Sequence, residues 1–212
     1  MFPPLPHEAI ILNYLAHVFL SGLNEELLIG NFIADSVRGS QLQQYPAGIA
    51  AGIILHRQID TFTDAHPVVH QTKNRLRPQY RKYAGVIADI YYDHFLAVNF
   101  HRYSSQPLAD YTQEVYGLVQ RYQSILPEKV QYFLPYMMEQ NWLLNYANIN
   151  GIRRSLTGLS RRTAFVSNMD TAATELENNY LLYEKEFQAF FPDLQAYVSR
   201  QVGAGPAANT AK

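Results

Sequence analysis

Four pairs of polar or ionisable residues, each spaced four positions apart, interrupt strongly apolar segments in the first hundred residues. The pairs are Asn13/His17, Asn31/Asp35, His56/Asp60 and Asp89/Asp93. Residues i and i+4 lie on the same face of an α-helix, so each pair would point two groups in one direction. Ionised carboxylates are costly to bury unless they are paired, hydrogen-bonded or bound to a cation. The four pairs therefore predict the lining of one site.

The side chains in and beside these pairs are imidazoles and carboxylates, and the chain has no cysteine to supply a thiolate. The candidate ligands are His17, Asp35, His56, Asp60, Asp64, Asp89, Asp93 and His94. Such a donor set suits Mn²⁺, Fe²⁺, Mg²⁺ or Zn²⁺, and ligand chemistry alone does not choose between them. A cation of this kind orients water, lowers its pKa and neutralises charge on a phosphoryl group.

The pairs differ in how strongly they indicate function. Asp89 and Asp93 would repel each other at this spacing, so we expect a cation or a large pKa shift to accompany them. A lone His17 on an apolar helix fits a hydrogen-bonded core histidine better than a ligand. His56 and Asp60 fit an ordinary ion pair within a helix equally well. The two asparagines suit orienting hydrogen bonds.

Two clusters of basic residues lie outside these pairs. They are Lys73, Arg75, Arg77, Arg81 and Lys82, and Arg153, Arg154, Arg161 and Arg162. Each residue alone fits a solvated surface, but two such clusters on a chain of formal net charge -1 favour an anionic partner or a phosphate group. Arg57, which follows His56, could reach a phosphate at the edge of the site.

Helical periodicity dominates the segments that must position these residues. We expect helices at about 8–21, 24–37, 44–64, 66–76, 78–103, 108–125, 128–147, 151–158 and 167–200. Pro46 and Pro67 fit helix starts, and residues 39–40 and 104–107 fit breaks. The sequence predicts an all-α, single-domain helical bundle over residues 1–202 and a flexible tail rich in Gly and Ala over 203–212.

Composition bounds the function further. With 212 residues, of which 48% are hydrophobic, the chain can bury one full core. The net charge gives no global signature of nucleic-acid binding. The apolar segment 10–20 lacks a positively charged leader and is too short and polar to span a bilayer. We therefore expect a soluble, cytoplasmic protein without a membrane or nucleic-acid partner.

Several of these segments, taken together, resemble the acyl carrier protein phosphodiesterase family. They are N-Y-L-A-H at 13–17, G-N-F-I-A-D at 30–35, G-I-x-L-H-R-x-I-D-x-x-T-D at 52–64, D-x-x-Y-D-H-F-L at 89–96, E-Q-N-W-L at 139–143 and S-R-R at 160–162. Their order and spacing match over about residues 10–200. The resemblance implies a divalent-metal hydrolase, with Mn²⁺ the usual cation, that cleaves 4′-phosphopantetheine from a serine of holo acyl carrier protein. It also implies a fold like that of the HD phosphohydrolases, although Asp93-His94 here reverses the His-Asp order.

The resemblance and the residue chemistry together suggest roles for the candidates. The preferred metal ligands are His56, Asp60, Asp89 and Asp93, followed by His17 and Asp35. His94 or Asp64 is expected to donate a proton to the leaving oxygen or to orient a ligand, and Arg57 to bind the phosphate. Acyl carrier proteins are acidic, so the two basic clusters are the expected docking surface.

Three other functions fit the same residues. The first is a prenyl-pyrophosphate-type enzyme that holds Mg²⁺ with Asp89 and Asp93, although it would need a second acidic motif. The second is an HD-like phosphohydrolase of a nucleotide or another small phosphodiester. The third is a non-catalytic helical module that binds an acidic partner, for which buried carboxylate pairs have no evident use.

Overall fold

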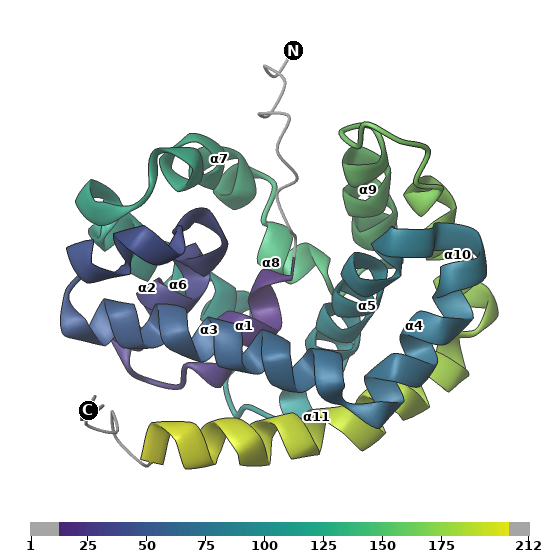
Figure 1. The fold of residues 1–212 in the computed structure, drawn as a ribbon, viewed down its shortest axis with the longest axis horizontal. Coiled ribbons are helices and arrows are strands. Elements are labelled where there is room, and N and C mark those ends of the chain that lie inside the picture. The colour runs from purple at the N-terminus through teal and green to yellow at the C-terminus, as the bar shows by residue number, and fades with distance from the viewer. Residues whose placement is uncertain (1–12, 204–212) are drawn as a thin grey trace.

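The computed structural model describes residues 13–203, and within this range every regular element is helical (Figure 1). The α-helices are α1 (Tyr14–Leu20), α2 (Glu25–Ile33), α3 (Ala47–Ala65), α4 (Pro67–Tyr80), α5 (Ala84–Val98), α6 (Leu108–Arg121), α7 (Glu128–Glu139), α8 (Trp142–Asn145), α9 (Ile149–Ser160), α10 (Ala172–Asn178) and α11 (Tyr180–Gly203). The 3₁₀ turns are η1 (Ala34–Ser36), η2 (Gly39–Gln44), η3 (Arg81–Tyr83), η4 (Phe100–Arg102), η5 (Gln123–Ile125) and η6 (Met169–Thr171). The expected all-α single-domain fold is confirmed.

Three predicted helix boundaries were wrong, each where the apolar pattern continues across a backbone break. Pro78 lies inside α4, and the chain instead turns at Arg81, which has a φ of 52°. The segment 128–147 is broken at Asn141, which has a φ of 47°. The segment 167–200 is broken at Asn179 between α10 and α11. A positive φ ends the helix at Arg81 and at Asn141, whereas Asn179 leaves the helical region with a φ of -122°. Hydrophobic periodicity reports neither kind of break.

Some predictions fall on parts of the chain that are not described. The expected start of the first helix at residue 8 lies outside the described residues, which enter α1 at Tyr14. The predicted tail also lies outside them, apart from Gly203, the last residue of α11. The HD-like fold and the division at residue 202 stay predictions.

Helices α2 and α3 pack with their backbones nearly in contact, because glycines face each other across the interface. A Cβ atom on Gly30 would lie 2.0 Å from the carbonyl oxygen of Ile49. A Cβ atom on Gly52 would lie 2.2 Å from the carbonyl oxygen of Leu27. Only residues without a side chain permit this approach. It places Asn31 of α2 beside His56 of α3.

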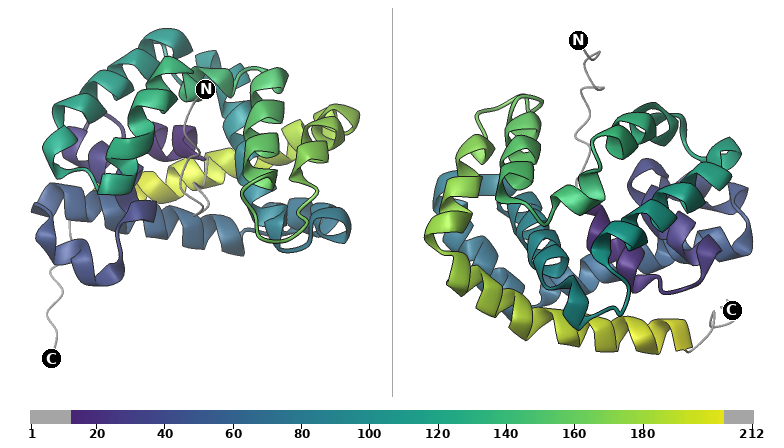
Figure 2. Two further views of the ribbon diagram at one scale, coloured as in Figure 1. Left: turned by 90° about the horizontal axis from the view of Figure 1, so that it is seen from above. Right: turned by 180° about the vertical axis from the view of Figure 1, so that it is seen from behind.

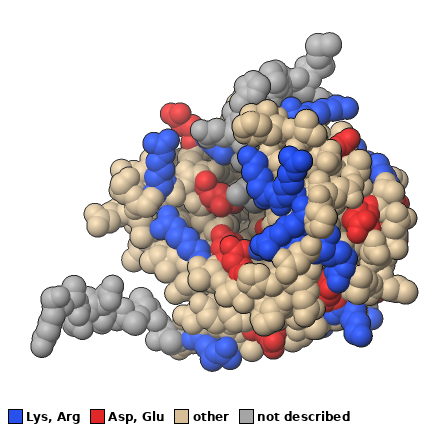
Figure 3. Space-filling view, turned by 45° about the vertical axis from the view of Figure 1, so that its right-hand side comes forward, with Lys and Arg blue, Asp and Glu red and all other residues tan. Residues whose placement is uncertain are grey.

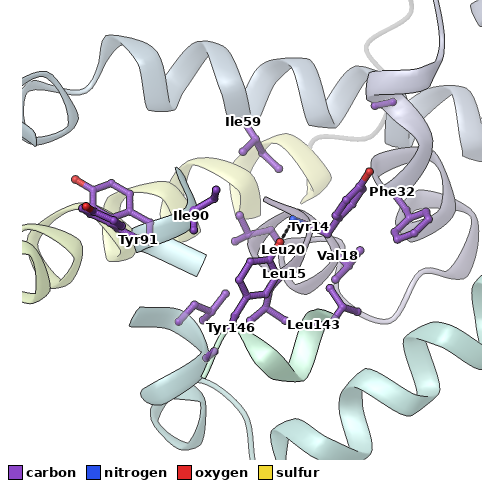
Figure 4. Close-up of a cluster of buried hydrophobic side chains, with 14 of the residues drawn as sticks. Tyr14, Leu15, Val18, Leu20, Phe32, Ile59, Ile90, Tyr91, Leu143 and Tyr146 are labelled. Carbon is purple, nitrogen blue, oxygen red and sulfur yellow. Dashed lines mark hydrogen bonds between the residues drawn. The ribbon is translucent and has the colours of Figure 1, made fainter. Parts of the chain in front are cut away.

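Helix α5 occupies the centre of the bundle, where it contacts α1, α4, α9 and α11 (Figure 1). The long helix α11 runs along one edge and contacts α3, α4 and α5 (Figure 2). Between α1, α2, α5 and α8 lies a core that includes Tyr14, Phe32, Ile90 and Tyr146, and the Tyr146 hydroxyl accepts from the backbone N–H of Tyr14 at 3.4 Å (Figure 4). None of the helices in residues 13–203 is both long and apolar enough to cross a lipid bilayer.

Candidate metal centre

Two buried imidazole rings, one from α1 and one from α3, form the centre of the site. The rings of His17 and His56 stack with centroids 3.9 Å apart and planes 20° apart. Nδ1 of His17 lies 2.9 Å, and Nδ1 of His56 3.1 Å, from the side-chain oxygen of Asn31. Nδ1 of His56 is also 2.9 Å from the backbone oxygen of Asn31. Because oxygen acceptors face both Nδ1 atoms, each Nδ1 carries a proton, and Nε2 is the nitrogen that either ring, when neutral, can offer to a cation.

The hydrogen bonds of the Asn31 Nδ2 atom fix the orientation of the side-chain amide. Its Nδ2 donates to the backbone oxygen of His17 at 2.7 Å and to the hydroxyl of Ser21 at 3.0 Å. With two acceptors on the nitrogen, the amide oxygen must face the imidazoles. Asn31 of α2 therefore sets the tautomer and the orientation of both rings, through its side-chain oxygen and, for His56, also through its backbone oxygen.

Carboxylates face the two Nε2 atoms. Asp60 places one oxygen 3.3 Å from Nε2 of His17 and the other 3.3 Å from Nε2 of His56. Asp35 places an oxygen 3.2 Å from Nε2 of His56. The histidine side chains are nearly inaccessible, whereas those of Asp60 and Asp35 are 47% and 29% exposed. The cluster is therefore anchored in the core and opens toward solvent through its carboxylates.

The charges of this cluster are strongly coupled. Burial disfavours a charged ring at His56, but the hydrogen bonds and charges of Asp35 and Asp60 outweigh it and raise the pKa of His56 to about 10. Burial, together with the neighbouring His56, lowers the pKa of His17. Burial opposes ionisation of Asp60, yet hydrogen bonds from the two histidines hold its pKa below the ordinary value. One ring thus stays neutral beside an ionised carboxylate.

The donor set fits a divalent cation. A neutral Nε2 and a carboxylate oxygen are both acceptors, and a cation between them satisfies both. Ligand atoms of His17, His56 and Asp60 all lie within 4.8 Å of one another. The hydrogen bonds from Nδ1 to Asn31 are of the kind that orients metal-binding histidines. Asp35 supplies a fourth donor beside His56.

A cavity of about 160 Å³ adjoins these groups. It is lined by Asn13, Asp35, His56, Asp60, Thr63, Asp64 and Asp89. Burial raises the pKa of Asp89 to about 7, against the opposing charge of Lys73. The ammonium of Lys73 donates to Asp64. The cavity is thus predominantly acidic, with one cation held at its edge.

Asp89 and Asp93, predicted as a pair of metal ligands, have different surroundings in the structure: Asp89 lines the cavity and Asp93 does not. Asp93 accepts from the backbone N–H groups of Leu15 at 3.0 Å and Ala16 at 2.8 Å, and from the hydroxyl of Tyr146. It also lines a small apolar pocket beside the cavity, together with His17 and Asp89. Burial raises the pKa of Asp93 to about 8, although the backbone donors oppose this shift. Asp93 therefore holds the first turn of α1, one turn before His17.

Two other predicted site residues do not line the cavity. Nδ1 of His94 donates to the backbone oxygen of Tyr146 at 2.7 Å, and its Nε2 lies 2.9 Å from the hydroxyl of Tyr180. Arg57 is exposed, and its guanidinium donates to the backbone oxygen of Val37 at 3.3 Å. The proton-donor role of His94 and the phosphate role of Arg57 stay predictions, and the structure gives both residues other partners.

The first basic cluster is only partly available at the surface, which corrects the expectation that all of it forms a docking surface. Lys73 is buried, with its ammonium on Asp64. Arg75 pairs with Glu186 at 2.9 Å and lies over the ring of Tyr183. Both cations are paired with carboxylates of this chain, which joins α4 to α3 and to α11.

The remaining basic residues of the two clusters lie on neighbouring segments. The ammonium of Lys82 lies 4.6 Å from the ring centroid of Phe165, in the loop after α9. The side chain of Asn168 donates to the backbone oxygen of Gln79 at 3.1 Å. Figure 3 shows Lys and Arg side chains gathered around a hollow that holds acidic side chains.

Comparisons with known proteins agree with one another. The sequence model of the acyl carrier protein phosphodiesterase family matches residues 12–194. The acyl carrier protein phosphodiesterase of Photorhabdus laumondii is 34% identical over 182 residues, which cover 85% of this chain and 92% of the relative. The proteins of the same name from Serratia proteamaculans and Escherichia coli are 31% and 32% identical, over 86% and 90% of this chain and 95% and 99% of the relatives. No solved structure matches the chain.

Proposed function

Because the chain belongs to the acyl carrier protein phosphodiesterase family, a family of phosphoric diester hydrolases, we propose that it removes the prosthetic group of holo acyl carrier protein. The bond cleaved is the phosphodiester between 4′-phosphopantetheine and a serine of the carrier protein. Hydrolysis adds water across this bond and gives apo acyl carrier protein and 4′-phosphopantetheine.

The observation that carries the proposal is the convergence of two oriented imidazoles and two carboxylates beside an open cavity. His17, His56, Asp60 and Asp35 would hold a divalent cation, with Mn²⁺ expected and Mg²⁺ or Fe²⁺ as alternatives. When bound, the cation would supply a Lewis acid that activates water and neutralises charge on the phosphoryl oxygens. The chain's own part is to fix both rings through Asn31 and to keep one side of the centre open.

The other residues of the cavity fit supporting roles. Asp89 lies at its wall and remains a candidate ligand. Asp64 also lines the cavity, where its carboxylate accepts from Lys73, so its predicted role as a proton donor to the leaving serine oxygen requires that it first take up a proton. Lys73, which donates to Asp64, adds positive charge where a phosphodiester anion would enter.

We further propose that the carrier protein docks on the exposed basic residues near the loop after α9. Arg77, Arg81, Lys82 and Arg161 are exposed, and the contact between Lys82 and Phe165 joins the two clusters. An acidic partner would be steered toward such a surface by long-range attraction, which falls as salt is added.

The proposal is tested by incubating the purified protein with holo acyl carrier protein and Mn²⁺, with and without a chelator, and following the mass of the carrier protein. We expect loss of the phosphopantetheine mass only when metal is free. His56→Ala should abolish the loss, whereas His70→Ala, at an exposed position on α4, should not. Turnover of a generic phosphodiester without loss from the carrier protein would favour the small-substrate hydrolase instead. Tight carrier binding with neither reaction would favour the binding module.

A further inference from the structure

A second cavity, of about 430 Å³, lies between one face of α9 and the segment formed by α8 and the turn before it. It is lined by Gln140, Trp142, Asn145, Gly151, Arg154, Ser155, Gly158 and Arg162. None of these residues lines the candidate metal centre. The described residues around this cavity include two arginines and no carboxylate. Its charge is therefore opposite to that of the metal site.

The face of α9 that borders the cavity is built from small and polar residues. Gly151, Ser155 and Gly158 recur at helical spacing, so they share one face, and Arg162 follows in the turn after the helix. A Cβ atom on Gly158 would lie 3.9 Å from Nη2 of Arg162. The guanidinium of Arg162 therefore lies against the helix at Gly158.

The two arginines of this cavity lack the partners that a neighbouring arginine has. Nη1 of Arg162 is buried and has no hydrogen-bond partner within residues 13–203. Among the described residues, Arg154 donates to the side-chain oxygen of Asn145 alone, at 3.3 Å. By contrast, Arg153 is paired with Glu177 at 2.6 Å. A buried guanidinium N–H without an acceptor is costly, and an anionic ligand removes that cost.

We propose that this cavity binds a phosphomonoester. Two guanidinium groups match the double negative charge of a phosphate monoester better than the single charge of a carboxylate, and they bind phosphate oxygens in a planar, paired geometry. Ser155 adds a hydroxyl donor, and the amides of Gln140 and Asn145, with the indole of Trp142, border the space left for an organic group. Inorganic phosphate and the 4′-phosphopantetheine that the proposed reaction releases share this chemistry. The binding itself does not depend on that reaction.

Trp142 is the single tryptophan of the chain, so its fluorescence reports on this cavity. The experiment titrates the full-length protein with inorganic phosphate, with 4′-phosphopantetheine and with unphosphorylated pantetheine, at constant ionic strength and with a chelator present. We expect a saturable change with the two phosphorylated compounds and none with pantetheine. Tighter binding of 4′-phosphopantetheine than of phosphate identifies the prosthetic group as the source, and equal binding identifies free phosphate.

The variants Arg162→Gln and Arg154→Gln should each weaken binding about tenfold or more, because each removes a charged donor. Arg154 is exposed, so its replacement leaves the fold intact even if Arg162→Gln does not fold. The matched control Arg153→Gln makes the same charge change on the same helix, outside the cavity, and should leave the affinity unchanged. No saturable response to either phosphorylated compound, an equal response to pantetheine, or equal weakening by Arg153→Gln would each overturn the proposal.

Discussion

The rings of His17 and His56 stack 3.9 Å apart and donate to the same side-chain oxygen, that of Asn31. Two stacked imidazoles cannot both be charged without strong repulsion, which agrees with a pKa that is raised at His56 and lowered at His17. The shared acceptor turns both Nε2 atoms toward Asp60. The geometry of the centre therefore depends on one uncharged residue, Asn31, which is not itself a candidate ligand.

Asn31→Leu tests this dependence. The substitution keeps the branched shape of the side chain but removes the acceptor, so His17 loses the hydrogen bond at Nδ1 and His56 keeps only the one to the backbone oxygen of residue 31. We expect Mn²⁺ affinity to fall by about 10- to 100-fold, as when the partner of a metal-binding histidine is removed. Isothermal titration of the purified variant with Mn²⁺ measures the change.

The matched control is Asn24→Ala. Asn24 caps the N-terminus of α2 by accepting from the N–H of Leu27, so its loss should cost about 1 kcal/mol of stability. It should leave metal affinity unchanged, because Asn24 does not contact either ring. Unaltered Mn²⁺ binding in Asn31→Leu would show that the rings are oriented by other contacts.

A second prediction concerns the α2–α3 contact that brings Asn31 to His56. Gly52→Ala should destabilise the protein by about 2 kcal/mol or more, since the new methyl group would overlap the backbone of α2. Gly117→Ala in α6, where a Cβ atom meets nothing within 4 Å, should instead stabilise it by about 0.5–1 kcal/mol. Urea unfolding of the two variants gives both values. Equal midpoints for the two variants would contradict the close packing of these helices.

The sequence predicted which residue types make up the site better than it predicted which of these residues contact one another. Spacing of four residues brought His56 and Asp60 onto one face, and the structure confirms that they meet. The other contacts of the centre, such as that between Asp35 and His56, join separate elements of the bundle. Helical spacing reports only neighbours within one helix, so it could not show that His17 and His56 would stack.

The Asp89/Asp93 pair shows that two residues on one face of a helix can still contact different parts of the molecule. The two residues share a face of α5, yet Asp93 accepts from backbone N–H groups at the N-terminus of α1, while Asp89 lines the cavity. Which of the two carboxylates caps α1 depends on how α1 packs against α5, and this tertiary packing cannot be read from helical spacing. The fold class followed from periodicity, whereas the breaks at Arg81 and Asn141 depended on local left-handed backbone.

Asp93→Asn should therefore act through α1. The amide keeps one acceptor oxygen but presents an NH₂ group to a backbone N–H of Leu15 or Ala16, which leaves a buried donor unsatisfied. We expect a loss of about 1–3 kcal/mol in unfolding free energy, measured by urea denaturation. Asp110→Asn, at an exposed position in the first turn of α6, should cost much less. If Asp93 is a ligand rather than a cap, the variant will lose Mn²⁺ binding without this loss of stability.

The last prediction is a pH dependence that arises at His94. Its Nδ1 must donate to the backbone oxygen of Tyr146, so its Nε2 accepts from the hydroxyl of Tyr180, and burial lowers the pKa of the ring. The unfolded chain then binds a proton near pH 6.5 that the folded protein resists. The stability that His94 contributes is therefore full above this pH and falls below it, by up to about 1.4 kcal/mol per pH unit.

The difference in unfolding free energy between the unaltered protein and His94→Gln, measured between pH 7.5 and about 5, checks this contribution. His94→Gln should lower stability at pH 7.5 but flatten the decline toward acid, because the titrating group is gone. His70→Gln, which replaces an exposed histidine on α4, should keep the slope of the unaltered protein. His94→Gln also tests the predicted proton-donor role of His94, since the loss of a proton donor would reduce hydrolysis by about 100-fold or more at every pH. Because His94 lies against Tyr146 and Tyr180 rather than in the cavity, we expect the flattened stability curve with hydrolysis largely retained.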